Sequence, residues 1–374
     1  MSPVYRLAYA TISGDMGLMD LFVKASPRPQ ARDRVVGIDI GSSSIKVVEL
    51  EERDGVVTLT TYGELQLGPY NEGGVIGQAT ILPANLERQA LVDILRESAV
   101  KAKRAVLAIP LSSSFVTTMS LEAGSDDDIS SRVRVDARKY IPVPIGDVTL
   151  DWAEITVKNA EVHGTRDVLL AAIQNDALKR FLNLMQTVEL PGPPTEIECF
   201  SAIRSTFETE KPNTAIIDIG ASVSKLYITE QGLLSRMHRV PAGGIKVTER
   251  MVEERQLSFA DAEALKRSVV STEPDYGWVQ KLTQVTYSRT IKEFHQVIEE
   301  YQTRSGIEIG DVVLTGGGAV GFGLDALIGH ELGRKVSIAN PFSKVAYPAF
   351  MEDTLTMIGP IFAPALGAAL RQFE

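Results

Sequence analysis

The sequence predicts an α/β fold made of two like-folded halves, with a smaller α/β segment inserted in the first half. Two observations lead to this prediction. Residues 36–48 (VGIDIGSSSIKVV) and 215–227 (AIIDIGASVSKLY) repeat one pattern at an offset of 179, and a stretch of different character lies between the copies. Around both copies, short β-branched runs alternate with helical patterns, as expected for strands and helices packed in layers.

Composition limits the classes of protein that fit. The chain has 374 residues, 44% hydrophobic and 23% charged, enough for two cores of a soluble globular protein. Its net charge of −10 argues against a general binder of nucleic acid. The single cysteine, Cys199, rules out an internal disulfide and suits a reducing compartment. Four scattered histidines show no metal-ligand spacing, so a structural zinc site is not expected.

No apolar run in the sequence approaches the ~20 residues needed to cross a bilayer. The nearest, TMIGPIFAPALGAAL near the C-terminus, is short and holds two prolines. We therefore expect a cytoplasmic protein. Residues 1–34 are expected to be a flexible N-terminal segment that ends in a Pro-rich basic linker, KASPRPQARDR.

The first half begins as strand, turn, strand. The runs VVGIDI, IKVVELEE and GVVTLTTYGEL are short, β-branched and separated by glycine and serine, which favours hairpins. A helix is expected over residues 86–103, where apolar side chains share one face. The run AVLAIP at 105–110 is typical of a buried strand.

The inserted segment runs from residue 112 to 188. It starts with the strand FVTTMSL and continues with a helix that carries Asp126 to Asp128 at its start and Arg138 and Lys139 at its end, as the helix dipole prefers. Two strands, DVTLDWAEITV and DVLLAAIQ, and a helix from Asn175 complete it. This pattern predicts a small α/β unit.

The second half begins near Thr214 with strands that run to about Val240, followed by the turn PAGG and two helices. The second helix starts at a capping box, Ser258 to Asp261. A long amphipathic helix ends near Gly306, and DVVLTGGGAVGFGLDALIGHEL reads as strand, glycine turn, helix. A helix around PALGAALRQ comes last.

The repeated turns suit phosphate. A glycine between two strands lets the backbone approach a ligand closely, and exposed N–H groups with serine hydroxyls make a site for anionic oxygen. Asp39 would sit beside such phosphates, where Mg²⁺ would relieve the charge repulsion. One such hairpin is more often an ordinary turn. Two at matching positions, followed by a third glycine turn at 315–318, indicate one nucleotide held between two halves.

The motifs VGIDIGSSSIK, IIDIGASVSK, PAGG, AEALKR and VVLTGGG, in this order over residues 35–370, resemble the actin-like ATPase superfamily. This resemblance implies an actin-like ATPase fold: two lobes with duplicated ribonuclease-H-like cores and an inserted α/β subdomain in the first lobe. ATP would lie in the cleft, with Mg²⁺ supported by Asp39 and Asp218. The groups implied to contact the nucleotide are Gly41, Ser42, Ser43, Ser44, Lys46, Gly220 and Ser222 at the phosphates, and Gly243, Gly244, Glu263, Lys266, Gly316, Gly317 and Gly318 on the nucleoside side.

Catalytic roles follow from the same resemblance. In such ATPases a residue of the helix that connects the lobes positions the attacking water, and Glu198 in IECFSAIR occupies that place, with Asp39 and Asp218 beside the metal. The alternative is that Glu198 only caps or flanks the helix. We expect ATP to bind with slow or no hydrolysis.

The inserted segment is more specific than the hairpins. DARKYIPVPIGDVTLDWAEI and DVLLAAIQNDALKRFLNLMQTVELPGPPTEIECFSAIR closely resemble the PilM family of type IV pilus assembly proteins, whose extra subdomain is shared with the cell-division protein FtsA. The resemblance implies a cytoplasmic scaffold at the inner face of the membrane that docks the N-terminal tail of a PilN-like membrane protein. Tyr140, Ile141 and Pro142 are the residues we expect at that groove; alternatively, Tyr140 and Ile141 are core residues and Pro142 a helix stop.

Two other functions stay open at this point: an FtsA-like filament that tethers membrane, and a small-molecule kinase of the superfamily. The first needs a C-terminal amphipathic helix and the second a polar substrate pocket, and neither is evident in the sequence. Self-association and contacts with other pilus proteins are also allowed. The expected division is 35–111 and 189–213 with 361–374 as subdomain 1A, 112–188 as 1C, 214–245 and 307–360 as 2A, and 246–306 as 2B.

Overall fold

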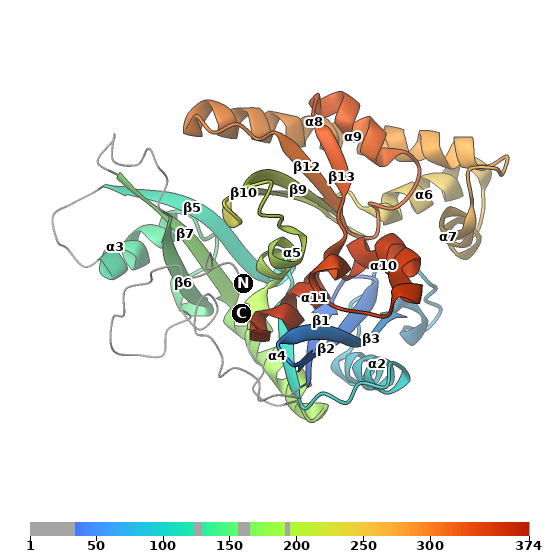
Figure 1. Cartoon of the computed structure of the whole chain (residues 1–374), viewed down its shortest axis with the longest axis horizontal. Coiled ribbons are helices and arrows are strands. Elements are labelled where there is room, and N and C mark those ends of the chain that lie inside the picture. Colours follow the sequence, from blue (N-terminus) through green and yellow to red (C-terminus); the bar gives the residue numbers. More distant parts are fainter. Residues whose placement is uncertain (1–33, 123–128, 156–164, 191–194, 374) are drawn as a thin grey trace.

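The computed structural model describes residues 34–122, 129–155, 165–190 and 195–373. Two predictions lie outside these ranges: the flexible segment up to residue 33, and the acidic helix start at Asp126 to Asp128. Within the described ranges, two large sheets and one small sheet form separate layers, and helices cover their outer faces (Figure 1).

The first lobe contains a five-stranded sheet in the order β3-β2-β1-β4-β8. β2 pairs antiparallel with both β1 and β3, whereas β4 runs parallel to β1 and β8 runs parallel to β4. Its strands are β1 (Arg34–Ile40), β2 (Ser44–Arg53), β3 (Val56–Gln66), β4 (Arg104–Ile109) and β8 (Thr195–Ile197).

The second lobe repeats this sheet in the order β11-β10-β9-β12-β13. Its strands are β9 (Asn213–Ile219), β10 (Ser224–Glu230), β11 (Leu233–Val240), β12 (Asp311–Thr315) and β13 (Lys335–Ile338). The strand order, the directions and even the register match the first sheet. Asp39 faces Lys46 across one hairpin and Asp218 faces Lys225 across the other. The sequence repeat is therefore a repeat of fold, and the predicted duplication is confirmed.

Turn chemistry explains why both hairpins form. Each outer hairpin closes through two residues in the left-handed region, Asp54-Gly55 and Gln231-Gly232, which matches the twist of the flanking strands. A shift of register falls at equivalent places, after Glu49 in β2 and after Ile228 in β10.

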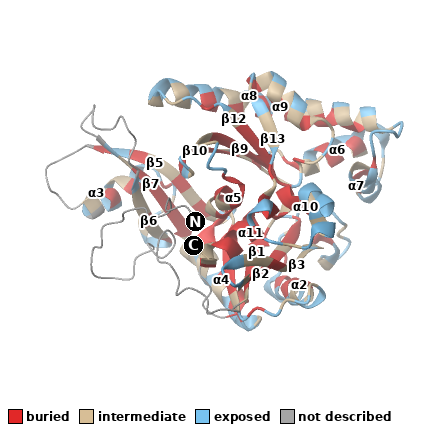
Figure 2. Cartoon of the chain, viewed as in Figure 1, coloured by how far each residue is buried: buried red, intermediate tan, exposed pale blue. Residues whose placement is uncertain are grey.

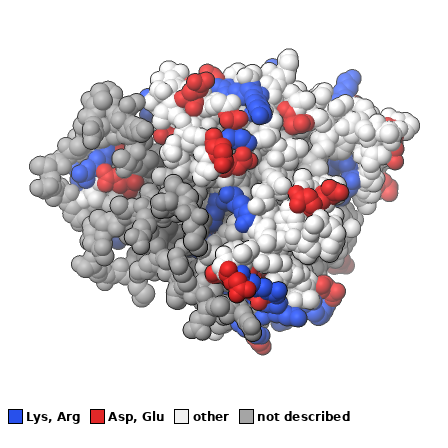
Figure 3. Space-filling model, in the orientation of Figure 1, with Lys and Arg blue, Asp and Glu red and all other residues white. Residues whose placement is uncertain are grey.

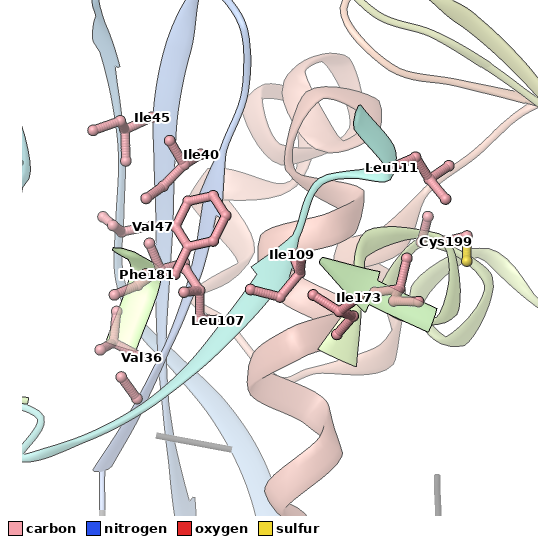
Figure 4. Close-up of a cluster of buried hydrophobic side chains, with 14 of the residues drawn as sticks. Val36, Ile40, Ile45, Val47, Leu107, Ile109, Leu111, Ile173, Phe181 and Cys199 are labelled. Carbon is pink, nitrogen blue, oxygen red and sulfur yellow. The ribbon is translucent and has the colours of Figure 1, made fainter. Parts of the chain in front are cut away.

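The inserted unit is a three-stranded antiparallel sheet in the order β5-β7-β6, with its own apolar cluster. Its elements are β5 (Ser114–Glu122), α3 (Ile129–Asp136), β6 (Val148–Ile155) and β7 (Thr165–Gln174). α4 (Asn175–Thr187) follows β7 directly, and its side chains pack in the core of the first lobe. In Figure 4 the ring of Phe181 lies among Ile40, Val47 and Leu107.

Helices cover the first sheet on both faces. They are α2 (Ala84–Glu97), α5 (Glu198–Thr206), α10 (Glu352–Ile358) and α11 (Ala363–Leu370). α11 is built of small residues because it lies close to two neighbours. A Cβ at Gly37 would collide with the backbone of Ala365, and one at Gly367 with that of Ser201. Figure 2 shows the strands and α11 as the most buried parts.

Among the described residues, one segment is long and apolar enough to cross a membrane, Ala349–Phe373, and 61% of its most apolar window is buried. It contains α11, every residue of which is buried in the first lobe. We therefore interpret this segment as a core element.

The second lobe carries α6 (Gly244–Arg255), α7 (Phe259–Ser268), α8 (Tyr276–Ser305) and α9 (Leu324–Leu332). The predicted caps are confirmed: the Ser258 hydroxyl accepts from the Asp261 N–H at 3.1 Å, and Gly306 ends α8 at φ 70°. Short 3-10 turns join the elements: η1 (Gly68–Tyr70), η2 (Leu111–Ser113), η3 (Ala137–Lys139), η4 (Ile145–Asp147), η6 (Pro341–Lys344), η7 (Ala349–Met351), η8 (Gly359–Phe362) and η9 (Arg371–Phe373).

One boundary differs from expectation. The helix predicted over 86–103 ends at Glu97, because Ala99 adopts φ 51° and turns the chain out of the helix. The next N–H groups, those of Lys101 and Ala102, both donate to the buried Glu49 carboxylate at 2.6 Å.

Candidate functional site

The two repeated turns meet tip to tip. In each, the glycine N–H closes the turn at 3.0 Å, from Gly41 to the Ser44 carbonyl and from Gly220 to the Val223 carbonyl. The hydroxyls of Ser42 and Ser222 lie 2.9 Å apart, which joins the lobes at this point. Two residues that lie 180 positions apart in the sequence are thus in contact across the lobes.

Two buried carboxylates and two lysines stand behind the turns. Asp39 and Asp218 are 7% and 5% exposed. Lys46 donates to the Ser44 hydroxyl at 2.8 Å. Lys225 donates to Asp218 at 3.1 Å and to Glu198 at 2.7 Å. The equivalent lysines therefore differ in use: one supports the turn and the other bridges two acids.

The charges of this cluster are unevenly compensated. Burial raises the pKa of Asp39 to about 6, and the nearby carboxylates of Glu198 and Asp218 add to the rise, while Lys46 and Lys225 oppose it. Burial by itself would lower the pKa of Lys225, but the charges of Asp218 and Glu198 outweigh it and raise that pKa well above its usual value. Asp39 is therefore the member that would gain most from an added cation.

Glu198, predicted as the catalytic carboxylate, is the first residue of α5 and is buried. One of its oxygens accepts from the Leu111 N–H at 2.7 Å, and the other accepts from Lys225 at 2.7 Å. Glu198 lies beside the Asp39 and Asp218 cluster, as the resemblance implied. Both of its oxygens already have partners.

Glycines allow three backbone segments to crowd together behind the second turn. A Cβ at Gly243 would collide with Ala221, and one at Gly316 with the Asp218 carboxylate. Gly316 also has φ 85°, and the Gly318 N–H donates to the Ile219 carbonyl at 2.8 Å. Gly244 donates to the Gly220 carbonyl at 3.0 Å and begins α6. The predicted glycines of the PAGG and TGGG turns thus lie around one hairpin.

Glu263 and Lys266 lie together on α7, facing the start of α6. They pair at 2.6 Å, and Lys266 also donates to the Gly244 carbonyl at 3.1 Å. Thr248 and Arg267 each donate to Glu263 at 2.6 Å. Burial would raise the pKa of Glu263, but Lys266 and these hydrogen bonds outweigh it and lower that pKa. Glu263 is therefore an ion held in place between α7 and the start of α6.

A loop of the first lobe, residues 67–83, spans from the first turn to α7, and we term it the strap. The Leu67 N–H donates to the Ser43 carbonyl at 2.8 Å, and the Thr80 N–H to the Ser42 carbonyl at 3.0 Å. At its far side Gly77, at φ 82°, lies so close to Glu263 that a Cβ would collide with that side chain. The strap therefore touches both lobes.

The predicted partner residues lie just after η3 in the inserted unit. Tyr140 is 43% exposed and Pro142 is exposed, whereas Ile141 is 5% exposed and belongs to the cluster under the inserted sheet. Only Tyr140 and Pro142 are therefore placed to meet a peptide directly.

Sequence reasoning missed three participants: Lys225 as a bridge between acids, the strap, and Leu111 with its neighbour Arg239. The first had a signal, since Lys225 repeats Lys46. The strap and Leu111 act through backbone groups, and Arg239 contacts the Leu111 carbonyl, so none of these contacts leaves a pattern in the sequence.

The residues present fit a nucleotide with Mg²⁺. Mg²⁺ usually takes one or two protein carboxylates, waters and phosphate oxygens, and buried Asp39 with its raised pKa supplies such a carboxylate.

No group of three or more His, Cys, Asp or Glu is arranged for a metal within the described part of the chain. A separate surface hollow of about 610 Å³, between the ends of α8 and α9, contains none of the site residues. Figure 3 shows acidic and basic side chains interspersed in small groups on one face.

Comparison with known proteins agrees with the two-lobed fold. A solved PilM-PilN type IV pilus biogenesis complex has a TM-score of 0.76 and 24% identity, over 93% of this chain and 100% of that chain. Ethanolamine utilization protein EutJ from Carboxydothermus hydrogenoformans has a TM-score of 0.55 and 14% identity, over 95% and 93%. MreB5 of Spiroplasma citri bound to ADP has a TM-score of 0.50 and 12% identity, over 90% and 95%. The predicted actin-like fold is confirmed. The family model of type IV pilus assembly protein PilM matches residues 37–373, and the chain belongs to this family.

Proposed function

We propose that this member of the PilM family is a cytoplasmic, ATP-binding scaffold of the type IV pilus inner-membrane complex, and that it docks the N-terminal tail of a PilN-like membrane protein. One observation supports ATP binding most directly. Two equivalent hairpins, each pairing an aspartate with a lysine, close on each other from opposite lobes.

The hairpins would hold the phosphates through the backbone around Gly41 and Gly220 and the hydroxyls of Ser42 and Ser222. Asp39 and Asp218 would support Mg²⁺, which when bound neutralises phosphate charge. Lys46 supplies a further cation near the first turn. The remaining predicted ligands, around α6, α7 and the TGGG turn, would line the nucleoside side: Gly243, Gly244, Glu263, Lys266, Gly316, Gly317 and Gly318.

Hydrolysis should be slow or absent. A general base must lie within hydrogen-bond reach of the attacking water. Glu198 is the candidate, but its two oxygens accept from the Leu111 N–H and from Lys225, and these contacts compete with a water for the carboxylate. Nucleotide would then act on the arrangement of the lobes more than as a fuel.

Partner docking is supported by the family and by the likeness to the solved PilM-PilN complex. A short extended peptide with apolar side chains suits a surface that combines exposed ring atoms with a sheet edge. Tyr140 and Pro142 present such atoms on the inserted unit. Docking of a membrane protein's tail would hold the chain at the inner face of the cytoplasmic membrane.

Calorimetry with ATP and Mg²⁺ tests the nucleotide claim. Asp39→Asn and Asp218→Asn should each weaken binding by about 10-fold or more, as expected when a carboxylate that supports the metal is lost. Asp54→Asn, in the exposed turn between β2 and β3, is the matched control and should bind as the parent does. Unchanged affinity in both site variants would refute this placement of the nucleotide.

A labelled N-terminal PilN peptide from the same genome tests the partner claim by fluorescence anisotropy. Tyr140→Ser should weaken binding, since the ring is 43% exposed and its loss leaves the core intact. Val135→Ser, at a 63% exposed position on α3, is the control for a general loss of surface apolar area. Absence of peptide binding to the folded parent protein, with and without ATP, would remove the claim.

A further inference from the structure

The link between the first lobe and the inserted unit passes through Leu111, whose backbone N–H and carbonyl are both hydrogen-bonded by side chains. Leu111 begins η2, directly after β4, and β5 of the inserted sheet starts three residues later at Ser114. Its N–H donates to Glu198, and its carbonyl accepts from Arg239 of β11 at 3.0 Å. Leu111 itself is 3% exposed, and Figure 4 shows its side chain in the buried cluster near Cys199.

A row of contacts joins the Leu111 N–H to Asp218 in the proposed nucleotide site. From Asp218 the contacts run to Lys225 at 3.1 Å, from Lys225 to Glu198 at 2.7 Å, and from Glu198 to Leu111 at 2.7 Å. Each link except the last is an ion pair between side chains that are at most 13% exposed. Buried ion pairs are screened weakly, so a change of charge at one end is felt along the row.

The inserted unit depends on this root for its orientation. Its β5 edge continues from η2, and the Ser114 hydroxyl donates to the Pro110 carbonyl at 3.2 Å. β5 pairs with β7 over its whole length, from Ser114 with Ile173 to Glu122 with Thr165. A shift at Leu111 would therefore reach β7 through β5, while side chains of both strands and of α4 also pack in the core of the first lobe.

Lys225 donates to two carboxylates that have different roles. Asp218 belongs to the proposed nucleotide site, whereas Glu198 accepts from the Leu111 N–H at the start of the inserted unit. When Asp218 is engaged by a cation, its attraction for Lys225 falls, and Lys225 shifts toward Glu198 or toward an anion in the cleft. Either shift changes the geometry of the carboxylate that holds the Leu111 N–H.

We propose that Glu198 and Arg239 couple occupancy of the cleft to the orientation of the inserted unit, and thereby to its affinity for the docked peptide. This inference rests on the proposed function, because it needs ATP in the cleft. Glu198 is a positioning residue in this scheme, since it acts on the peptide surface through Leu111. By linkage, peptide binding should change ATP affinity by the same factor as ATP changes peptide affinity, on the order of 5-fold or more.

Hydrogen exchange, read by mass spectrometry on peptides from β5 and β7, tests the coupling without any activity measurement. In the parent protein, ATP with Mg²⁺ should change exchange in both strands. In Glu198→Gln the amide oxygen still accepts from Leu111, but the ion pair with Lys225 is lost; in Arg239→Gln the grip on the Leu111 carbonyl is lost. Each variant is compared with the parent at an ATP concentration that saturates it, as fixed by calorimetry, and the response of β5 and β7 should be reduced to about one fifth or less.

Arg236→Gln is the control, since it removes an arginine from the same strand and no hydrogen bond among the described residues joins Arg236 to η2. It should respond as the parent does. A purely structural role for Glu198 would lower the melting temperature yet leave the ATP response intact, and that result would overturn the inference. ATP binding by the parent with no change in β5 and β7 would also overturn it, while the proposed function would stand. Failure of the parent to bind ATP would overturn both.

Discussion

Replacing Asp39 by asparagine should make the protein more stable near neutral pH. The pKa of this buried carboxyl is raised from 3.8 to about 6, a difference of about 2 pH units. At about 1.36 kcal/mol per unit, its ionisation costs the folded state about 3 kcal/mol at pH 7. Asparagine keeps the shape and removes the charge, so Asp39→Asn should recover most of this cost.

The stability difference between Asp39→Asn and the parent should depend on pH in a definite direction. Folded Asp39 binds its proton more tightly than the unfolded chain does, so the cost is absent below about pH 4, grows as the pH rises, and is complete above about pH 6. The stability gap between Asp39→Asn and the parent should therefore widen by about 2 to 3 kcal/mol between pH 4 and pH 7. The pH effects of groups outside this cluster cancel, because they act equally on both proteins.

Thermal unfolding without nucleotide or Mg²⁺, at a series of pH values, measures this gap as a difference in apparent melting temperature of a few degrees. Asp54→Asn serves as the control and should track the parent at every pH, because its carboxylate is exposed. A gap for Asp39→Asn that is constant with pH, or that narrows toward pH 7, would refute the argument from burial.

Further predictions use paired substitutions. Gly316→Ala should weaken ATP binding by about 10-fold or more, because the added Cβ would collide with the Asp218 carboxylate and because the backbone at Gly316 has φ 85°. Gly317→Ala is the control and should bind ATP normally in the same calorimetry, since no described atom beyond the neighbouring residues lies within 4 Å of its Cβ. Gly77→Ala should increase protease cleavage of the strap and speed release of a fluorescent ATP analogue, whereas Gly73→Ala, at φ 72° with open space around it, should not. Glu49→Ala should lower stability by about 3 kcal/mol in thermal unfolding, since it leaves the backbone donors of Lys101 and Ala102 without their acceptor and removes one of the two ion pairs of Arg34. A mild effect of this last change would show that water replaces the carboxylate.

The repeat made most of the fold predictable because its signals are local. Alternating β-branched residues, X-Gly turns and two aspartates at equivalent positions specify a hairpin each, and duplication then brings the hairpins together. The same locality explains the confirmed cap at Ser258 and the end of α8 at Gly306. The end of α2 was missed, because Ala99 takes a left-handed conformation without the glycine that usually marks one.

The candidate site was predictable in membership and only partly in geometry. Asp39, Asp218 and Glu198 do lie together, as their motifs indicated. What the sequence does not contain is the pairing among them: that Lys225 is held by Glu198, and that Glu198 reaches a backbone N–H 87 positions away. Such pairings depend on how three elements pack, and the residue types alone allow many of them. Ile141 shows the same limit, since an apolar residue beside Tyr140 serves a core or a surface equally well.

The contacts between the two lobes are weaker on the side of the strap than on the opposite side of the site. On one side the lobes share continuous chain and buried ion pairs, whereas on the strap side the hydrogen bond between lobes, from Arg267 to Gln66, is exposed and 3.3 Å long. A hydrogen bond to a charged group contributes up to about 3 kcal/mol net, but exposure to water and the 3.3 Å distance weaken this one. A nucleotide would therefore exchange through the strap side, and its release would require both the opening of this weak contact and the loss of the phosphate contacts to the hairpins.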